Sequence, residues 1–452
     1  MSAELLSILA LIVMFVVATV FPVNLGALAL VGAFLVGTLA AGMSTDDILG
    51  AFPGSLFVIL VGVTLLFAIA TNNGTVDWLV RAAVHLVRGR LAAIPPVVFV
   101  ISALLTAVGA PAPAVAAILA PIAFGFAADY RIHPMLIGLM VAHGTQAGAF
   151  SPISVLGGIV NGVTKDAGLP SDNLSLFLSS FAFNAAAGVV VFFVFGGMDL
   201  LRRGSIAPDT APGASGNPAP SGDAPTSESS GTATKTARDT ATETSSAGGG
   251  GLRLTPHQAL TLTGILALCL AVLAFKLDVG LTAITVAVIL SLTSPRTNKG
   301  AVERVAWPTV LLICGVVTYV GVLQEIGTVD YVGSAVAAIG IPLLVALLIC
   351  YVGGVVSAFA STVGILGALV PLAVPLLSQG SLGPIAMIAA LSVSSAIVDV
   401  SPFSTTGALL VANVRGMERD VFYRRLLTYG AAIVLVGPLA AWAVLVAPGW
   451  LG

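Results

Sequence analysis

The sequence predicts an all-α polytopic membrane protein with two inverted repeats, each built from five transmembrane helices, one of them broken, and a re-entrant hairpin. Three observations predict this architecture. Of the 452 residues, 58% are hydrophobic and only 8% are charged, and the mean hydropathy is +1.08, whereas soluble domains carry about 25% charged residues. Similar motifs recur in the same order in the two halves of the chain, and basic residues are distributed unevenly among the predicted loops.

A polar segment divides the apolar chain. Residues 204–252 consist mainly of Pro, Gly, Ser, Thr and Ala, with scattered charges. Such a composition buries too little apolar surface to offset the entropy of ordering, which predicts disorder. We therefore divide the chain into a first repeat, 1–203, a disordered linker, 204–252, and a second repeat, 253–452.

Apolar stretches of membrane-spanning length predict the helices. The first repeat has them at 4–22, 25–43, 54–72, 133–163 and 174–198, and the second at 257–275, 278–294, 308–325, 383–413 and 425–447. Between the third and fourth helix of each repeat lies a longer, interrupted segment, 91–130 or 341–379. We expect each to enter the membrane and return to the same side, because broken backbone is tolerated at depth only where protein or water covers it.

Three matched motifs support the repeat. NNGTVDWLVRAA in the first half resembles EIGTVDYVGSAV in the second, and Pro121 aligns with Pro371. A Ser-Pro-X-Ser pattern begins at Ser151 in GAFSPISVLGG and again, 250 residues later, at Ser401 in VDVSPFSTTGALL. The alternative is a chance likeness between two sequences rich in Gly, Ala, Val and Leu, but the shared order favours a repeat.

The basic residues predict the orientation in the membrane. Outside the linker, one side receives thirteen Lys and Arg residues and the other only Lys165 and Lys276. The crowded side is expected to be cytoplasmic, which places the linker in the cytoplasm and both termini outside the inner or plasma membrane. The loop after the third helix is basic only in the first half, and the loop after the broken helix is basic mainly in the second. The two repeats are therefore expected to be inverted, as in secondary transporters.

The composition excludes several other classes of protein. The net charge of −2, with no stripe of Lys and Arg, argues against a nucleic-acid partner. The cysteines Cys269, Cys314 and Cys350 lie in apolar runs without paired spacing, as expected of small buried residues. We find no HExxH motif, no paired intramembrane aspartates, no Ser/His dyad and no ATP-binding motif. The sequence thus predicts neither an enzyme nor a primary pump, and no organic cofactor.

The Ser-Pro interruptions supply the predicted binding site. Proline breaks a helix, and the exposed helix N-termini attract anions while freed carbonyl groups can hold a cation. The alternative is that each Ser-Pro is only a kink. The broken segments contribute Gly148, Ser151, Pro152 and Ser154 from the first repeat, and Asp399, Ser401, Pro402, Ser404, Thr405 and Thr406 from the second.

Two titratable residues near the interruptions are candidate ion sites. Asp399 lies in the middle of its apolar segment, where an ionisable group is costly and usually functional. It can coordinate Na⁺ or carry a proton, and the alternative is that it only caps the half-helix after the break. His143 is a candidate proton site, with a packing role as the alternative. No arginine is expected in the site, so helix ends, hydroxyl groups and bound cations would recognise the anion.

The order of elements resembles the divalent-anion:sodium symporter family and its wider ion-transporter superfamily, and within it most closely the MatC-type malonate/dicarboxylate carriers. The tip of the second hairpin, SAFASTVGILGALVP, carries part of this resemblance, because Ser361 stands ten residues before Pro371. The resemblance covers nearly all of the chain except the linker. It implies a homodimer in the lipid bilayer and a site in which Ser361 and Thr362 bind the carboxylate and, with Asp399, Na⁺.

The first hairpin departs from the pattern of this family. Pro111, Ala112 and Pro113 stand where polar side chains are expected. Only backbone groups around Gly109 and Ala110 can therefore contribute to the site, which argues against a symmetrical pair of sodium sites.

Two functions remain open from the sequence. The first is secondary transport of a small dicarboxylate, of the malonate or C4 type, coupled to Na⁺ or H⁺ by alternating access. The second is Na⁺/H⁺ antiport or another inorganic ion exchange within the same superfamily. An exchanger generally needs more than one buried carboxylate or a lysine partner, and Asp399 is the single clear case, which favours the first. The sequence identifies neither the anion nor the coupling ion.

Overall fold

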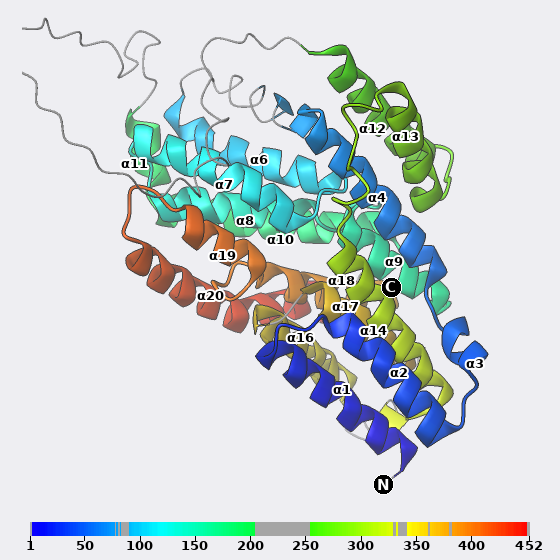
Figure 1. Cartoon of the computed structure of the whole chain (residues 1–452). Coiled ribbons are helices and arrows are strands. Elements are labelled where there is room, and N and C mark those ends of the chain that lie inside the picture. The colour runs from blue at the N-terminus through cyan, green and yellow to red at the C-terminus, as the bar shows by residue number, and fades with distance from the viewer. Residues whose placement is uncertain are drawn as a thin grey trace, which may run out of the picture.

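The computed structural model of the protein describes residues 2–76, 78–79, 82, 90–203, 254–328, 331–332, 341–359, 362–378 and 382–449. Its regular elements are helices (Figure 1). The predicted linker and Ser361 lie outside the described residues. The all-α polytopic fold is confirmed, whereas the inverted orientation of the repeats and the division of the chain stay predictions.

The predicted helices of the first half are all present. They are α1 (Ala3–Val20), α2 (Leu25–Ala41), α4 (Gly54–Asn72), the hairpin α6–α7 (Ile94–Ala107 and Ala112–Asp129), the broken helix α8–α9 (Pro134–Gly148 and Val155–Asp166) and α10 (Asn173–Val194). Two short helices, α3 (Thr45–Gly50) and α11 (Gly197–Arg203), and a 3-10 turn at Leu91–Ala93 were not predicted. The predicted end of α10 at residue 198 is wrong, because Gly196 adopts φ 95° and the chain bends there.

The second half follows the same order. Its helices are α12 (Pro256–Leu273), α13 (Val279–Thr293), α14 (Trp307–Glu325), the hairpin α16–α17 (Pro342–Phe359 and Thr362–Ser378), the broken helix α18–α19 (Pro384–Ile397 and Thr405–Asn413) and α20 (Arg419–Ala441), which continues as a π-helical turn, Trp442–Val446. The last helix begins six residues before the predicted 425, because its charged first turns continue the helix beyond the apolar stretch.

The two halves are interleaved rather than separate. Helix α2 packs on α14 of the other half, and α13 packs on α4. In the centre, the hairpin arm α7 contacts α19, and the hairpin arm α17 contacts α9. Each half-helix after a break is thus supported by the hairpin of the other half, which places both breaks at the interface between the halves (Figure 1).

Matched glycines allow the outer pairs of helices to approach closely. A Cβ on Gly26 of α2 would lie 2.0 Å from the Leu311 carbonyl oxygen of α14, and one on Gly315 of α14 would lie 2.0 Å from the Gly26 carbonyl oxygen. The equivalent pair is Gly62 of α4, 2.6 Å from the Gly280 carbonyl oxygen of α13. Small residues at such crossings are typical of helix packing in membranes.

Six of the described helices are long and apolar enough to cross a membrane, judged by length and composition. They are α4, α7, α10, α12, α14 and α20 with its π-helical turn. The outward face of α10 is apolar, with Val190 59% and Val194 67% exposed. Such a surface fits contact with lipid.

Candidate functional site

Both broken helices are interrupted by Ser-Pro turns that make the same hydrogen bonds. The Ser154 hydroxyl accepts from the N–H group three residues later at 3.1 Å, which caps α9, and donates to the Ser151 carbonyl at 2.8 Å. The Ser404 hydroxyl does the same for α19, at 3.0 Å and 2.9 Å, the second bond reaching the Ser401 carbonyl. Residues 149–154 and 398–404 are non-helical, so the Ser-Pro motifs form turns and not simple kinks.

The first serine of each motif ties the break to the hairpin of its own repeat. The Ser151 hydroxyl donates to the Ala107 carbonyl at the end of α6. The Ser401 hydroxyl donates to the Ala358 carbonyl near the end of α16, at 2.8 Å. These hydroxyls satisfy carbonyl groups that the ending helices leave without partners. The positions of turn and hairpin tip are therefore coupled in both halves.

Asp399 lies where the two repeats meet. Its Oδ2 atom accepts a 2.7 Å hydrogen bond from Gln146 Nε2 of α8 and a 3.2 Å bond from the Thr406 hydroxyl of α19. Ser404, and not Asp399, is the N-cap of α19, so the alternative that Asp399 serves only as a helix cap does not hold. One residue from each repeat thus orients the carboxylate.

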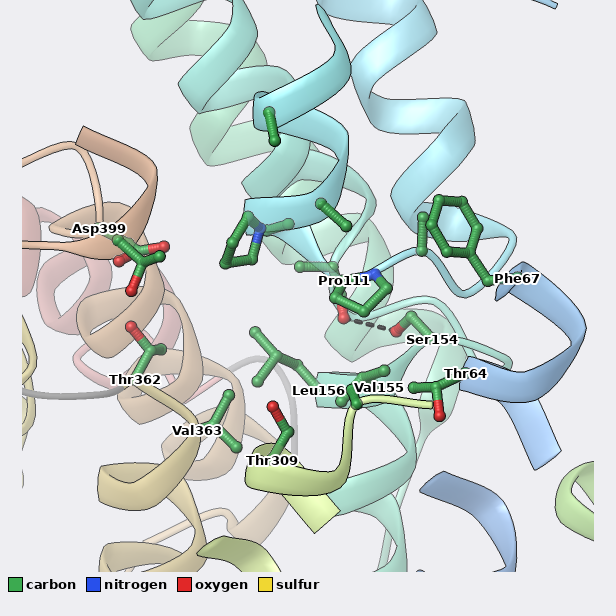
Figure 2. Close-up of a pocket in the computed structure, with 18 of the residues that line it drawn as sticks. Thr64, Phe67, Pro111, Ser154, Val155, Leu156, Thr309, Thr362, Val363 and Asp399 are labelled. Atoms are coloured by element: carbon green, nitrogen blue, oxygen red, sulfur yellow. Dashed lines mark hydrogen bonds between the residues drawn. The ribbon is translucent and has the colours of Figure 1, made fainter. Parts of the chain in front are cut away.

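A cavity of about 800 Å³ lies between the hairpins and the broken helices (Figure 2). Of the residues predicted for the site, those that line it are Ala110, Ser154, Thr362, Asp399, Ser404 and Thr405. Figure 2 shows Asp399, Thr362 and Val363 on one side of this space and Ser154 and Thr64 on the other. Residues of the second half of the chain thus face residues of the first half across it.

Five helix N-termini of the described chain border the cavity. They belong to the two hairpin arms α7 and α17, to the two half-helices α9 and α19, and to α14, and the first turn of each contributes lining residues. The first N–H groups of a helix have no partner within the helix, and the helix dipole places partial positive charge there. A convergence of such ends favours an anion.

The other predicted residues support the site without lining the cavity. Gly109 sits at the tip of the first hairpin with φ 112°, which side chains rarely allow. A Cβ on Gly148 would lie 2.0 Å from the Ala103 carbonyl oxygen, so this glycine permits α8 to pack on α6. Thr406 acts through Asp399. Pro152 and Pro402 lie within the turns, like Ser151 and Ser401.

His143 is fully buried and does not line the cavity. Its Nδ1 atom lies 2.9 Å from Asn184 Oδ1, and its Nε2 atom lies 2.6 Å from the Tyr429 hydroxyl. Since the Asn184 amide nitrogen donates to the Ser180 carbonyl, its oxygen is the acceptor, and the network assigns the proton to Nδ1. Both ring nitrogens are then occupied in a neutral imidazole. This geometry favours the packing alternative, and a proton site at His143 stays a prediction.

Several residues that line the cavity were missed from the sequence, among them Gln146, Arg304 and Thr309. Gln146 lines the cavity and holds Asp399, but the sequence placed it only near the first break. Arg304 also lines the cavity, with its Nη1 atom 2.5 Å from Asn72 Oδ1. The expectation that no arginine would lie in the site is therefore wrong. Arg304 precedes α14 in a loop whose basic residues were used only to predict the orientation in the membrane. No local motif in that loop indicates that it reaches the cavity.

The oxygen atoms near Asp399 fit the chemistry of Na⁺. Asp399 and Thr362 both line the cavity, although the Thr362 hydroxyl already lies 2.8 Å from the Ser357 hydroxyl. In the described part of the chain, no group of three or more His, Cys, Asp and Glu side chains is placed to hold a metal ion. A cation there would depend on one carboxylate, hydroxyls and carbonyls, which are the ligands of hard cations.

Comparisons with known proteins show which families and which fold the chain is similar to. Residues 1–149 match the family described as the N-terminus of the dicarboxylate carrier protein MatC, and residues 269–447 match the family described as citrate transporter. The crystal structure of the YdaH transporter from Alcanivorax borkumensis is similar in fold, with a TM-score of 0.60 at 14% identity, over 90% of this chain and 88% of that chain. A search of curated proteins found no match. The predicted resemblance is confirmed, and the matching families are transporters rather than enzymes.

Proposed function

We propose that the protein is a secondary transporter that carries a small dicarboxylate, of the malonate or C4 type, through the central cavity by alternating access, coupled to Na⁺ or H⁺. The observation that carries this proposal is the convergence of five helix N-termini on a cavity of about 800 Å³ that also exposes Asp399. The two family descriptions, dicarboxylate carrier and citrate transporter, support the substrate class.

The helix ends supply the proposed anion contacts. The hydroxyls of Ser154 and Ser404 are engaged as caps, so they orient backbone N–H groups rather than bind the substrate themselves. The hydroxyls of Thr309 and Thr405 make no hydrogen bond among the described residues and line the cavity. We assign to them the side-chain contacts with the carboxylates of the substrate.

Asp399 is the proposed coupling group. The cavity exposes it, and its Oδ2 atom is held by Gln146 of one repeat and Thr406 of the other. Binding of a cation or a proton at this carboxylate therefore acts on hydrogen bonds to both halves. Its negative charge also opposes a dianion in the cavity, so cation and substrate are expected to bind cooperatively.

The cavity is proposed to face the cytoplasm in this conformation. Arg304 and Thr71, both lining residues, stand at the ends of α14 and α4 that adjoin the predicted cytoplasmic loops. The orientation, with both termini outside, and the homodimer implied by the family resemblance belong to the same proposal. Labelling of cysteines introduced at residues 2 and 452, but not within the linker, by an impermeant reagent on intact cells would test the orientation.

Transport into proteoliposomes tests the function directly. Purified protein should take up labelled malonate or succinate in a saturable way, and an inward Na⁺ or H⁺ gradient should accelerate the uptake. The two gradients are applied separately to identify the coupling ion. Failure to carry any dicarboxylate, together with Na⁺/H⁺ exchange, would instead establish the antiporter. The single carboxylate that lines the cavity argues against that outcome.

A further inference from the structure

A second cavity, of about 810 Å³, lies away from the central site and is lined by a cluster of basic side chains. We call it the basic groove. Its basic members are Arg131 and His133 of the turn before α8, Arg202 and Arg203 at the end of α11, and Arg425 of α20. None of these basic residues lines the central cavity.

Among the described residues, few acidic side chains offset the positive charge of the basic groove. Asp199 is the single acidic residue that lines it, and the part of the chain that the structure describes contains no salt bridge between these arginines and a carboxylate. Arg203 is held in place by backbone carbonyls, with Nη1 3.0 Å from the Arg131 oxygen and Nη2 2.8 Å from the Tyr130 oxygen. The groove thus presents ordered, unpaired cationic groups, which suit an anion.

The two contacts of His133 cannot both be hydrogen bonds accepted by its ring. The N–H group of Met135 lies 3.2 Å from His133 Nδ1, and Arg425 Nη1 lies 3.0 Å from His133 Nε2. A neutral imidazole has one accepting nitrogen, and a protonated one has none. One of the two contacts therefore sets two donors face to face. An anion that accepts from both Arg425 and His133 would supply the acceptor that resolves the conflict.

The groove lies at the ends of candidate membrane spans. The candidate spans α7 and α10 end beside it at Asp129 and Val194, and the span of α20 begins near it at Arg419. Its remaining wall is apolar, formed by Val194, Phe195 and Leu200. Val194 is 67% exposed on the outward face of α10. Basic pockets between helices at this level bind anionic lipid head groups.

We propose that the basic groove binds the phosphate of an anionic phospholipid, with an acyl chain lying along α10. Arginines donate to phosphate oxygens in pairs, and the apolar wall offers contact that a free phosphate ion would not use. Free phosphate has the same anionic group as the lipid head, and the experiment below distinguishes the two ligands. The acidic residues of the linker, which follows Arg203 in the chain, are the competing occupant.

The test uses the full-length protein, purified in detergent and titrated with phosphatidylglycerol, phosphatidylcholine or inorganic phosphate, with binding read by native mass spectrometry and by thermal melting. We expect phosphatidylglycerol to bind and to raise the melting temperature, and the other two to have little effect. The variants Arg202→Gln and Arg425→Gln should each weaken phosphatidylglycerol binding about fivefold, and the double variant about 25-fold. Arg424→Gln is the matched control, because Arg424 is adjacent to Arg425 and does not line the groove.

Several outcomes would overturn the proposal. Equal stabilisation by phosphatidylcholine would show a general lipid effect. Binding of inorganic phosphate with the same loss in the variants, and no preference for the lipid, would identify a free-anion site. Lipid binding that appears only after deletion of residues 210–245 would show that the linker occupies the groove in the intact protein. Unchanged melting of the lipid-free variants is the control for folding.

Discussion

The two Ser-Pro turns differ in chemistry although their backbones are built alike. Each has a capping serine, Ser154 or Ser404, and a first serine bonded to a carbonyl of the neighbouring hairpin. Yet Ala149 occupies the position of Asp399. The duplicated features are those that hold backbone groups, and the ionisable group is present once. A repeated scaffold can therefore support a site in which the carboxylate comes from one repeat alone.

The helices before the two turns also differ in the polar side chains that they carry. Helix α8 of the first repeat carries Gln146, which donates to Asp399, and His143, whose ring bonds to Asn184 and Tyr429. Position 396, 250 residues after Gln146, is an alanine. The first repeat thus contributes fixed, neutral polar groups and the second contributes the carboxylate. Five tests, in order of decreasing expected effect, examine the two repeats and what connects them.

Asp399→Asn should have the largest effect. It removes the single carboxylate that lines the cavity, while the helix ends that attract the anion remain. We expect gradient-driven uptake to fall about 5- to 150-fold, the usual span of a coupling free energy, with substrate exchange partly retained. Uptake with and without the gradient is measured in proteoliposomes, with Asp172→Asn, a loop residue, as control. Unchanged ion dependence would move the coupling group elsewhere.

Gln146→Ala should weaken cation binding without removing the carboxylate. The variant loses the 2.7 Å bond to Asp399 Oδ2, and a hydrogen bond to a charged group contributes about 1.5–3 kcal/mol. The Na⁺ or H⁺ concentration for half-maximal uptake should rise about tenfold or more. Thr145→Val, on the same helix, removes only a bond to the Ala142 carbonyl and should change the coupling little. If both variants raise the half-maximal ion concentration equally, the effect of Gln146→Ala does not come from its hydrogen bond to Asp399.

Gly26→Ala and Gly280→Ala test whether the matched glycines allow equally close helix packing in the two repeats. The new Cβ would lie 2.0 Å from the Leu311 carbonyl oxygen in the first case and 2.6 Å from the Ile59 nitrogen in the second. Overpacking of this kind costs about 1–3 kcal/mol, so both variants should lower the melting temperature by similar amounts. Gly125→Ala serves as control, since its Cβ meets no atom within 4 Å. A loss confined to one repeat would contradict equivalent packing.

Arg304→Gln should have a smaller effect, because Arg304 is exposed. Its charge is expected to attract the dianion to the cavity, and contacts between exposed charges contribute about 0.2–1 kcal/mol. The KM for a dicarboxylate should rise up to about fivefold at low salt, and the difference should shrink at high salt. Arg296→Gln, from the same loop but not lining the cavity, should keep the parent KM. A change in maximal rate alone would argue against anion capture.

Deletion of residues 210–245 should have the smallest effect. This segment belongs to neither repeat, and its composition predicts a flexible tether. Uptake by the deletion variant should match the parent when corrected for the amount of protein in the membrane. Reduced uptake at normal insertion would assign the linker a role beyond connecting the repeats.

Much of the fold was predictable because lipid imposes simple rules on a chain. The predicted span 54–72 coincides with α4, and both interrupted segments are hairpins. Long apolar stretches must form helices, since no water satisfies their backbone groups. The miss at the end of α10 came from Gly196, whose effect depends on its local φ of 95° rather than on hydropathy.

The sequence by itself predicted the helices and their interruptions and singled out Asp399 as a candidate, because apolar length, Ser-Pro turns and a lone intramembrane carboxylate are local signals. Only the tertiary structure decided which residues meet at that carboxylate. Gln146 reaches Asp399 across 253 positions of the chain, and Arg304 reaches the cavity from a loop. Such pairs arise from packing between helices, where contacts depend on the crossing of elements and not on any neighbouring motif.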